Sequence, residues 1–299
     1  MEEDKLVIQQ VLEERFQGHD TRKHLYLELE KEVGVPIISF FTSFTYAVML
    51  EDNDADMLEG ILQKCDLSEG FALFLSSPGG SGLAAERIIN ICRSYSGTRG
   101  YIAIIPGKAK SAATMICLGA SKIIMGKTSE LGMIDPQIVV EEEKEPKWFS
   151  LYNIVKSYEE LFGKAVKEKG NLQPYLQQLA NYDAREIAEY RSALSLSEDI
   201  AVKSLEAGML SGLTEGEIKK KIEIFLTPEK GKKVHGRPIY AQDAVDCDLK
   251  VEIRDVKEKF WSVVYELYIR LNNYVSTNNI AKCIECKDYS FRATVGGKS

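Results

Sequence analysis

A serine, Ser111, stands at the start of a small-residue helix that we expect to follow the apolar run 101–105. Further upstream, a second apolar run, 71–75, is followed by Gly79 and Gly80. Glycines after a strand let backbone N–H groups approach a substrate oxygen with no Cβ in the way. The positive end of a helix favours the oxyanion that forms when a serine attacks a carbonyl. A glycine pair after one strand, followed by a serine at the start of the helix after the next strand, predicts the active site of a serine hydrolase with a layered β–α core.

The segments around these residues alternate between short apolar runs and amphipathic stretches. We expect strands at 36–41, 71–75, 101–105 and 122–125, helices at 52–65, 82–95 and 111–118, and a loop at 127–137. Strands that alternate with helices of this length predict a parallel sheet with both faces covered.

The flanking segments have different patterns. The first 32 residues and residues 147–208 are mostly helical in pattern, 141–147 is a charged stretch expected as an exposed loop, and 211–233 is polar. Residues 255–274 form a strongly amphipathic pattern, which predicts a helix docked on the core or on another subunit.

Composition excludes some functions. The net charge of −7 argues against nucleic-acid binding as the main task. The charged first ten residues lack the apolar centre of a signal peptide. The most apolar stretch, 35–50, is interrupted by polar residues and is shorter than the roughly 20 residues of a membrane-spanning helix. We expect it to form a buried strand followed by a turn. We therefore expect a cytoplasmic protein without a membrane span.

Six scattered cysteines do not indicate a disulfide framework. Cys92 and Cys117 lie in apolar periodic segments and are expected as buried thiols. Cys283 and Cys286 form a single CxxC, and no second pair in the tail completes the four ligands of a structural zinc. We expect no metal and no cofactor; a zinc shared across a subunit interface and a redox pair are the less favoured readings of this CxxC.

Three segments give the chain a family resemblance. They are SSPGGSGLAAERI (76–88), IIPGKAKSAATMICLGASKIIMGKTSELGMIDPQI (104–138) and HGRPIYAQDAVDCDLKV (235–251). Through them, residues 22–253 resemble the serine dehydrogenase proteinase family, which is related to signal peptide peptidase A and to the Clp proteolytic subunit within the ClpP/crotonase-like superfamily. In the third segment, Asp248 stands where the superfamily has a glycine.

The resemblance implies an α/β fold, a ClpP/crotonase-like spiral of β-β-α units with a mostly parallel sheet and a C-terminal helical extension. The domain boundaries expected from it are an N-terminal helical segment at 1–34, the core at 35–254, and a C-terminal amphipathic helix and tail at 255–299.

The resemblance also implies roles for single residues. Ser111 matches the nucleophile, and Gly79, Gly80 and Ala112 match the oxyanion site. Where the Clp-like branch has its histidine base, this sequence has Asp135, so that triad is not available.

The signal peptide peptidase branch uses a lysine base that follows the serine by several tens of residues. Lys156 and Lys164 both fall in that range. A lysine can act as a base where burial disfavours its charged form. Lys156 has the more apolar surroundings and is the preferred candidate.

Two other residues have open readings. Asp135 either orients the site or caps a turn before Pro136. His235 could act as a base, but a structural histidine is the favoured interpretation.

We expect a serine peptidase that cleaves polypeptide in an enclosed site of a homo-oligomer. The alternative is a catalytically inactive crotonase-like assembly or binding module. Acyl-CoA chemistry is disfavoured, because Ser111 lies where crotonases need no nucleophile.

Overall fold

A computed structural model describes residues 5–14, 17–140, 147–228, 237–277 and 279–296. His235 and most of the expected loop at 141–147 lie outside these residues.

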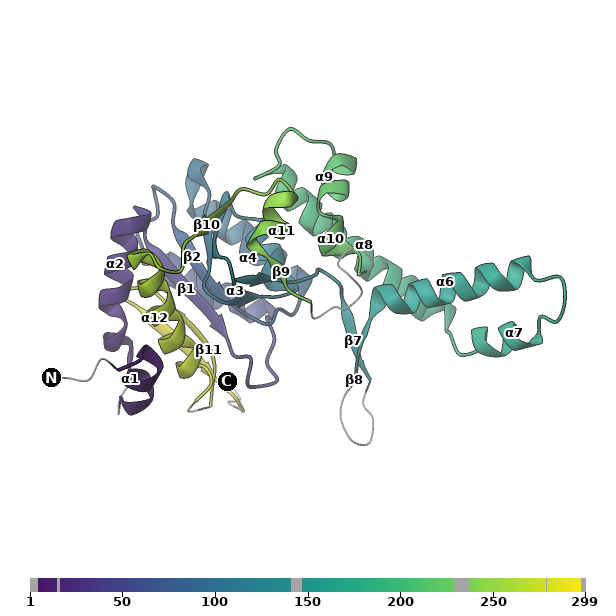
Figure 1. The fold of residues 1–299 in the computed structure, drawn as a ribbon, viewed down its shortest axis with the longest axis horizontal. Coiled ribbons are helices and arrows are strands. Elements are labelled where there is room, and N and C mark those ends of the chain that lie inside the picture. The colour runs from purple at the N-terminus through teal and green to yellow at the C-terminus, as the bar shows by residue number, and fades with distance from the viewer. Residues whose placement is uncertain (1–4, 15–16, 141–146, 229–236, 278, 297–299) are drawn as a thin grey trace.

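A seven-stranded sheet forms the centre of the molecule, in the order β10-β5-β3-β2-β1-β11-β12 (Figure 1). Its parallel strands are β1 (Ile37–Thr42), β2 (Ala72–Ser76), β3 (Ile102–Ile105), β5 (Lys122–Gly126) and β10 (Val251–Arg254). The expected α/β fold with a mostly parallel sheet is therefore confirmed.

Helices cover both faces of this sheet because its strands are apolar on both sides. Ile38 and Phe40 of β1 pack into one core, and Ile37 and Phe41 into the other, as the two-residue period of a strand requires. The first core is covered by α3 (Asp52–Leu62), α4 (Gly82–Tyr95), α5 (Ala112–Leu118) and the end of α8 (Ala184–Glu206). The second is covered by α2 (Lys23–Val33) and α12 (Lys259–Tyr274), which pack on each other.

The tail after α12 belongs to the sheet. Strand β11 (Ile280–Glu285) pairs antiparallel with β1, and β12 (Ser290–Thr294) pairs antiparallel with β11. The sequence pattern predicts only a helix and a tail here. Two charged residues, Lys282 and Glu285, interrupt the apolar pattern of β11, yet both are buried in ion pairs, which the sequence pattern alone does not reveal.

A hairpin and a helical arm extend from the sheet. The hairpin consists of β7 (Gln137–Val140) and β8 (Lys147–Ser150), and the arm of α6 (Leu151–Lys167), α7 (Gln173–Leu179) and the first part of α8. Figure 1 shows α6 and α7 projecting away from the sheet.

The remaining elements are short. They are α1 (Val7–Glu13), η1 (His19–Thr21), η2 (Gly97–Arg99), α9 (Glu215–Lys221), α10 (Glu223–Leu226), α11 (Ala241–Asp246), and a small sheet of β4 (Lys108–Ala109), β6 (Glu130–Leu131) and β9 (Ile239–Tyr240). Asp248, which stands at the family's glycine, has a left-handed φ of 60°, which aspartate tolerates better than most residues. Within the described ranges, no helix combines the length and the apolar character that crossing a membrane demands.

Candidate active site

Ser111 lies in a strained turn between β4 and α5. Its φ is 50° and its ψ is −120°, outside the left-handed region that non-glycine residues occasionally adopt. Such a conformation costs on the order of 1–3 kcal/mol and persists only where the surroundings hold it. It is found mainly at functional sites, as in the turn that exposes the nucleophile of α/β-hydrolases.

Backbone hydrogen bonds hold this turn against the end of β2. The N–H of Ser77 donates to the carbonyl of Lys108 at 3.1 Å, and the N–H of Lys110 donates to the carbonyl of Ser77 at 3.0 Å. On the other side, the Thr114 hydroxyl donates to the Ala109 carbonyl at 2.8 Å. The serine is thus fixed by both neighbouring segments.

Lys110 precedes Ser111, but its ammonium is engaged elsewhere. It forms a 2.7 Å ion pair with Glu130 and donates to the Leu131 carbonyl at 3.1 Å. Burial lowers the pKa of Lys110, although the hydrogen bond and charge of Glu130 oppose this effect. These contacts attach the Ser111 turn to β6.

Two glycines lie against the Ser111 turn and the Leu50 backbone. Gly79 has a φ of 96°, and a Cβ placed there would lie 2.5 Å from the Lys110 carbonyl oxygen and 2.8 Å from the Ser111 Cβ. Gly80, with a φ of 155°, is packed against Leu50, whose N–H donates to the Gly79 carbonyl at 2.8 Å. Only glycine fits both positions, because neither conformation nor space admits a side chain.

The backbone donors near Ser111 are not equivalent. The N–H of Gly79 donates to the Ser77 hydroxyl at 3.2 Å. The N–H groups of Gly80 and Ala112 form no hydrogen bond with any residue that the structure describes. Ala112 is the first residue of α5, where a helix leaves its N–H groups without intrahelical acceptors.

These residues border a hollow of about 590 Å³. It is lined by Ser43, Phe44, Tyr46, Ala47, Val48, Met49, Glu51, Pro78, Gly79, Gly80, Ser111, Asp135, Pro136, Gln137 and Trp148. The Ser111 hydroxyl has no hydrogen-bond partner within the described chain. Phe44, Met49 and Trp148 are 43%, 40% and 48% exposed, so the hollow has apolar walls open to solvent.

Asp135 lies in the same hollow as Ser111 and is almost fully buried. Its carboxylate accepts a hydrogen bond from the backbone N–H of Tyr152 at 3.4 Å. Asp135 therefore connects the segment after β6 to the first turn of α6.

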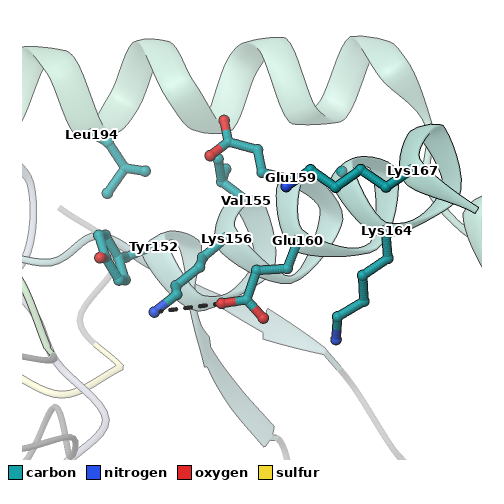
Figure 2. Close-up of a pocket in the computed structure, with 9 residues that line it drawn as sticks. Tyr152, Val155, Lys156, Glu159, Glu160, Lys164, Lys167 and Leu194 are labelled. Carbon is teal, nitrogen blue, oxygen red and sulfur yellow. Dashed lines mark ion pairs between the residues drawn. The ribbon is translucent and has the colours of Figure 1, made fainter.

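Lys156 lies on α6 in a different hollow, of about 670 Å³, which Lys164 also lines (Figure 2). Its ammonium is 3.6 Å from a carboxylate oxygen of Glu160. It follows Tyr152, the residue bonded to Asp135, by one helical turn. The structure thus brings Ser111, Gly79, Gly80, Ala112 and Asp135 together, but Lys156 and Ser111 line separate hollows.

The apolar walls were not predicted from the sequence. A strand and a turn were expected over 35–50, whereas residues 43–49 form one wall and Trp148 of β8 contributes another. A signal was present, because Phe44 and Met49 are large apolar residues in an expected turn. No group of three or more His, Cys, Asp or Glu side chains suited to hold a metal occurs in the described parts of the chain.

Comparison with known families agrees with the expected resemblance. Residues 31–159 match the family of ClpP-like SDH-type serine proteinases. The matched segment contains the Gly79–Gly80 pair, Ser111, Asp135 and Lys156. The resemblance to the serine dehydrogenase proteinase family is confirmed over these residues.

Two curated relatives come from Methanocaldococcus jannaschii. The uncharacterized protein MJ0137 is 33% identical over 106 residues, which are 35% of this chain and 33% of that protein. The uncharacterized protein MJ1495 is 32% identical over 106 residues, which are 36% of this chain and 32% of that protein. The chain matches about a third of the length of each relative.

Among solved structures, two mutants of a membrane-bound stomatin-specific protease are similar. One, in complex with a substrate peptide, is 15% identical with a TM-score of 0.30, and the match covers 74% of this chain and 93% of that chain. The other is 16% identical with a TM-score of 0.29, and covers 71% and 94%. TM-scores this low do not by themselves establish a shared fold.

Proposed function

We propose that this protein is a serine peptidase with Ser111 as its nucleophile. The observation that carries the proposal is the strained turn that holds Ser111 against Gly79 at the border of an open hollow. Hydrogen bonds to the end of β2 and to β6 maintain this strained conformation. The residue held there is a serine, as expected for the nucleophile of a serine proteinase family.

In the proposed reaction, the Ser111 hydroxyl attacks the carbonyl carbon of a peptide bond. The resulting oxyanion accepts hydrogen bonds from the N–H groups of Gly80 and Ala112, which have no acceptor among the described residues. The base takes the hydroxyl proton and delivers it to the leaving amine, and water then hydrolyses the acyl-enzyme. Gly79 supports this geometry through its contact with Ser111, while its own N–H is bonded to Ser77.

Lys156 remains our candidate for the base. It lies one helical turn beyond Tyr152, whose N–H is bonded to Asp135 beside Ser111. To act on Ser111, its long side chain must leave the neighbourhood of Glu160 and enter the other hollow. Asp135 would then contact the ammonium and orient it.

The hollow supports a polypeptide substrate. Phe44, Met49 and Trp148 offer exposed apolar surface in the hollow that Ser111 borders. Burying one apolar side chain of a substrate there would contribute about 1.5–3 kcal/mol to binding.

The test is covalent labelling with a fluorophosphonate, followed by peptide mapping. We expect the label on Ser111 in the wild type and none in Ser111→Ala. The control Ser192→Ala, an exposed serine of α8, should label like the wild type. Turnover of a casein-like substrate should fall on the order of a thousandfold or more in Ser111→Ala, and retained turnover would refute the assignment.

A catalytically inactive assembly or binding module is the second candidate. The observation that favours it is the lack of a lysine or histidine among the described residues lining the Ser111 hollow. This candidate predicts no labelling of Ser111 in the folded wild type, so the same experiment separates the two.

We further propose that the protein is a cytoplasmic homo-oligomer. Its six cysteines are free thiols, as is usual in a reducing compartment. The arm of α6 and α7 carries exposed apolar residues, among them Phe162 and Val166, which a second subunit could cover. A light-scattering mass near 33.6 kDa, that of one chain, would contradict the oligomer.

A further inference from the structure

Two cysteines far apart in the sequence have their sulfur atoms side by side. Cys65 follows the end of α3 and Cys286 follows the end of β11. The Cys65 thiol donates to the Cys286 sulfur at 3.7 Å, across a separation of 221 residues. Disulfide formation requires the two sulfur atoms to approach further, to about 2.05 Å.

The CxxC motif does not form this pair. Residues three apart on an extended chain point to opposite faces. Cys283 accordingly packs in the core beneath α2 and α12, while Cys286 packs in the core beneath α3 and α4. The Cys283 thiol contacts the carboxylate of Glu285 at 3.4 Å.

Cys286 is held in place and chemically activated. Its N–H donates to the Tyr289 carbonyl at 2.8 Å, and its carbonyl lies 2.6 Å from Nε2 of His19. The hydrogen bond from Cys65 lowers the pKa of Cys286 to about 7; burial opposes this, and the backbone N–H groups of Asp288 and Tyr289 lower it further. The thiolate is the nucleophilic form of cysteine.

Cys65 is the more exposed member of the pair, since Cys286 is only 3% exposed. It is partly exposed in the turn after α3, between the exposed residues Lys64 and Asp66. By contrast, Cys92 and Cys117 are completely buried, and burial raises the pKa of both thiols above its ordinary value. The reactive pair is therefore distinct from the inert cysteines of the core.

We propose that Cys65 and Cys286 are a redox modification site, which hydrogen peroxide converts to an intramolecular disulfide. The Cys286 thiolate attacks one peroxide oxygen, the O–O bond breaks, and the hydroxide that leaves is protonated to water. The sulfur of Cys65 then attacks the Cys286 sulfenic acid, losing its proton, and a second water leaves. Two thiols lose two electrons and two protons, and one peroxide is reduced to two waters.

The bond would link the end of α3 to the strand beside β1. The loop that lines the Ser111 hollow joins β1 to α3. The disulfide would therefore link the segments on either side of this loop and restrict its movement, independently of any activity at Ser111. Because it also closes a very long loop of the unfolded chain, it should raise the Tm by about 5 °C or more.

The experiment treats the folded 299-residue chain with hydrogen peroxide and maps its peptides without reduction. We expect an intact mass lower by two hydrogen atoms, a peptide that links Cys65 to Cys286, and full reversal by dithiothreitol. The Tm should rise on oxidation and return on reduction.

Variants make the test specific. Cys65→Ser and Cys286→Ser should each abolish the linked peptide and the rise in Tm, and Cys283→Ser should retain both. If Cys286→Ser does not fold, Cys65→Ser alone decides, because Cys65 is partly exposed. A Cys283–Cys286 disulfide, a link between two chains, or sulfinic acid without a disulfide would overturn the proposal.

Discussion

The backbone of Gly79 lies directly against the side chain of Ser111, close enough that a Cβ on the glycine would overlap the serine Cβ at 2.8 Å. The two residues come from different strand–helix connections, one after β2 and the other before α5. Both residues line one hollow, together with Gly80. The conformation of the serine therefore depends on the absence of a side chain at Gly79.

Gly79→Ala should abolish labelling of Ser111 by a fluorophosphonate and lower the free energy of unfolding by about 2 kcal/mol or more. The added Cβ would meet backbone atoms, and the φ of 96° is unfavourable for alanine. Gly60→Ala is the matched control, because Gly60 is exposed on α3 with no atom within 4 Å of its added Cβ. It should label normally and gain about 0.5–1 kcal/mol.

Substitutions of Ser111 measure the strain in its backbone. Glycine tolerates a φ of 50° and a ψ of −120°, but alanine does not. The free energy of unfolding, measured by urea denaturation, should therefore be about 1 kcal/mol higher for Ser111→Gly than for Ser111→Ala. Equal stability of the two variants would show that the turn relaxes and stores no strain.

Lys156→Met should reduce turnover about 10²–10⁴-fold, because a general base contributes that much to the rate. Lys164→Met is the control, since Lys164 lines the same hollow on the same helix. It should change turnover little. If Lys156→Met retains near wild-type turnover with an unchanged pH profile, Lys156 is not the base.

Replacing Glu285 should destabilise the protein and change its response to acid. Arg22 and Glu285 form a fully buried ion pair at 2.6 Å. Burial raises the pKa of Glu285, but the hydrogen bond and charge of Arg22 outweigh it and hold the pKa below the ordinary 4.5. The pair thus contributes stability above about pH 4.5, which is lost as the pH falls through the lower pKa of the folded state.

Glu285→Gln should cost about 3–5 kcal/mol at pH 7, because it leaves the Arg22 charge buried without its partner. The difference from the wild type should shrink below pH 4.5 in urea unfolding. Glu69→Gln breaks the exposed pair of Glu69 with Arg99 and should cost less than about 1 kcal/mol. A loss at Glu285 that does not depend on pH would contradict this account.

Oxidation of the Cys65–Cys286 pair should accelerate as the pH rises through about 7. The thiolate fraction of Cys286 grows across that range, because its pKa is lowered to about 7. Disulfide formation measured from pH 5.5 to 10.5 should therefore follow a single titration with a midpoint near pH 7. A midpoint near the ordinary value of 9.0 would mean that Cys65 does not activate Cys286.

Local sequence patterns determined most of the central fold. The helix expected at 82–95 has these bounds in the structure, and the strand expected at 71–75 is β2 (Ala72–Ser76). These elements follow from apolar periodicity and glycine positions over a few residues, which are properties of short segments. The same is true of Ser111 and the two glycines, since each lies at the boundary of an expected element.

Tertiary structure decided what depends on residues distant in the chain. The partner of Cys286 is Cys65 rather than Cys283, and Lys156 lines a different hollow from Ser111. Strand β11 was not expected, because charged residues such as Lys282 and Glu285 usually face solvent. In the structure both are buried, because Lys282 pairs with Asp54 and Glu285 pairs with Arg22. The periodicity of apolar residues predicts which side chains prefer to be buried. It does not predict which distant residue will pair with a buried charge or lie beside a thiol, because those contacts form only when the chain folds.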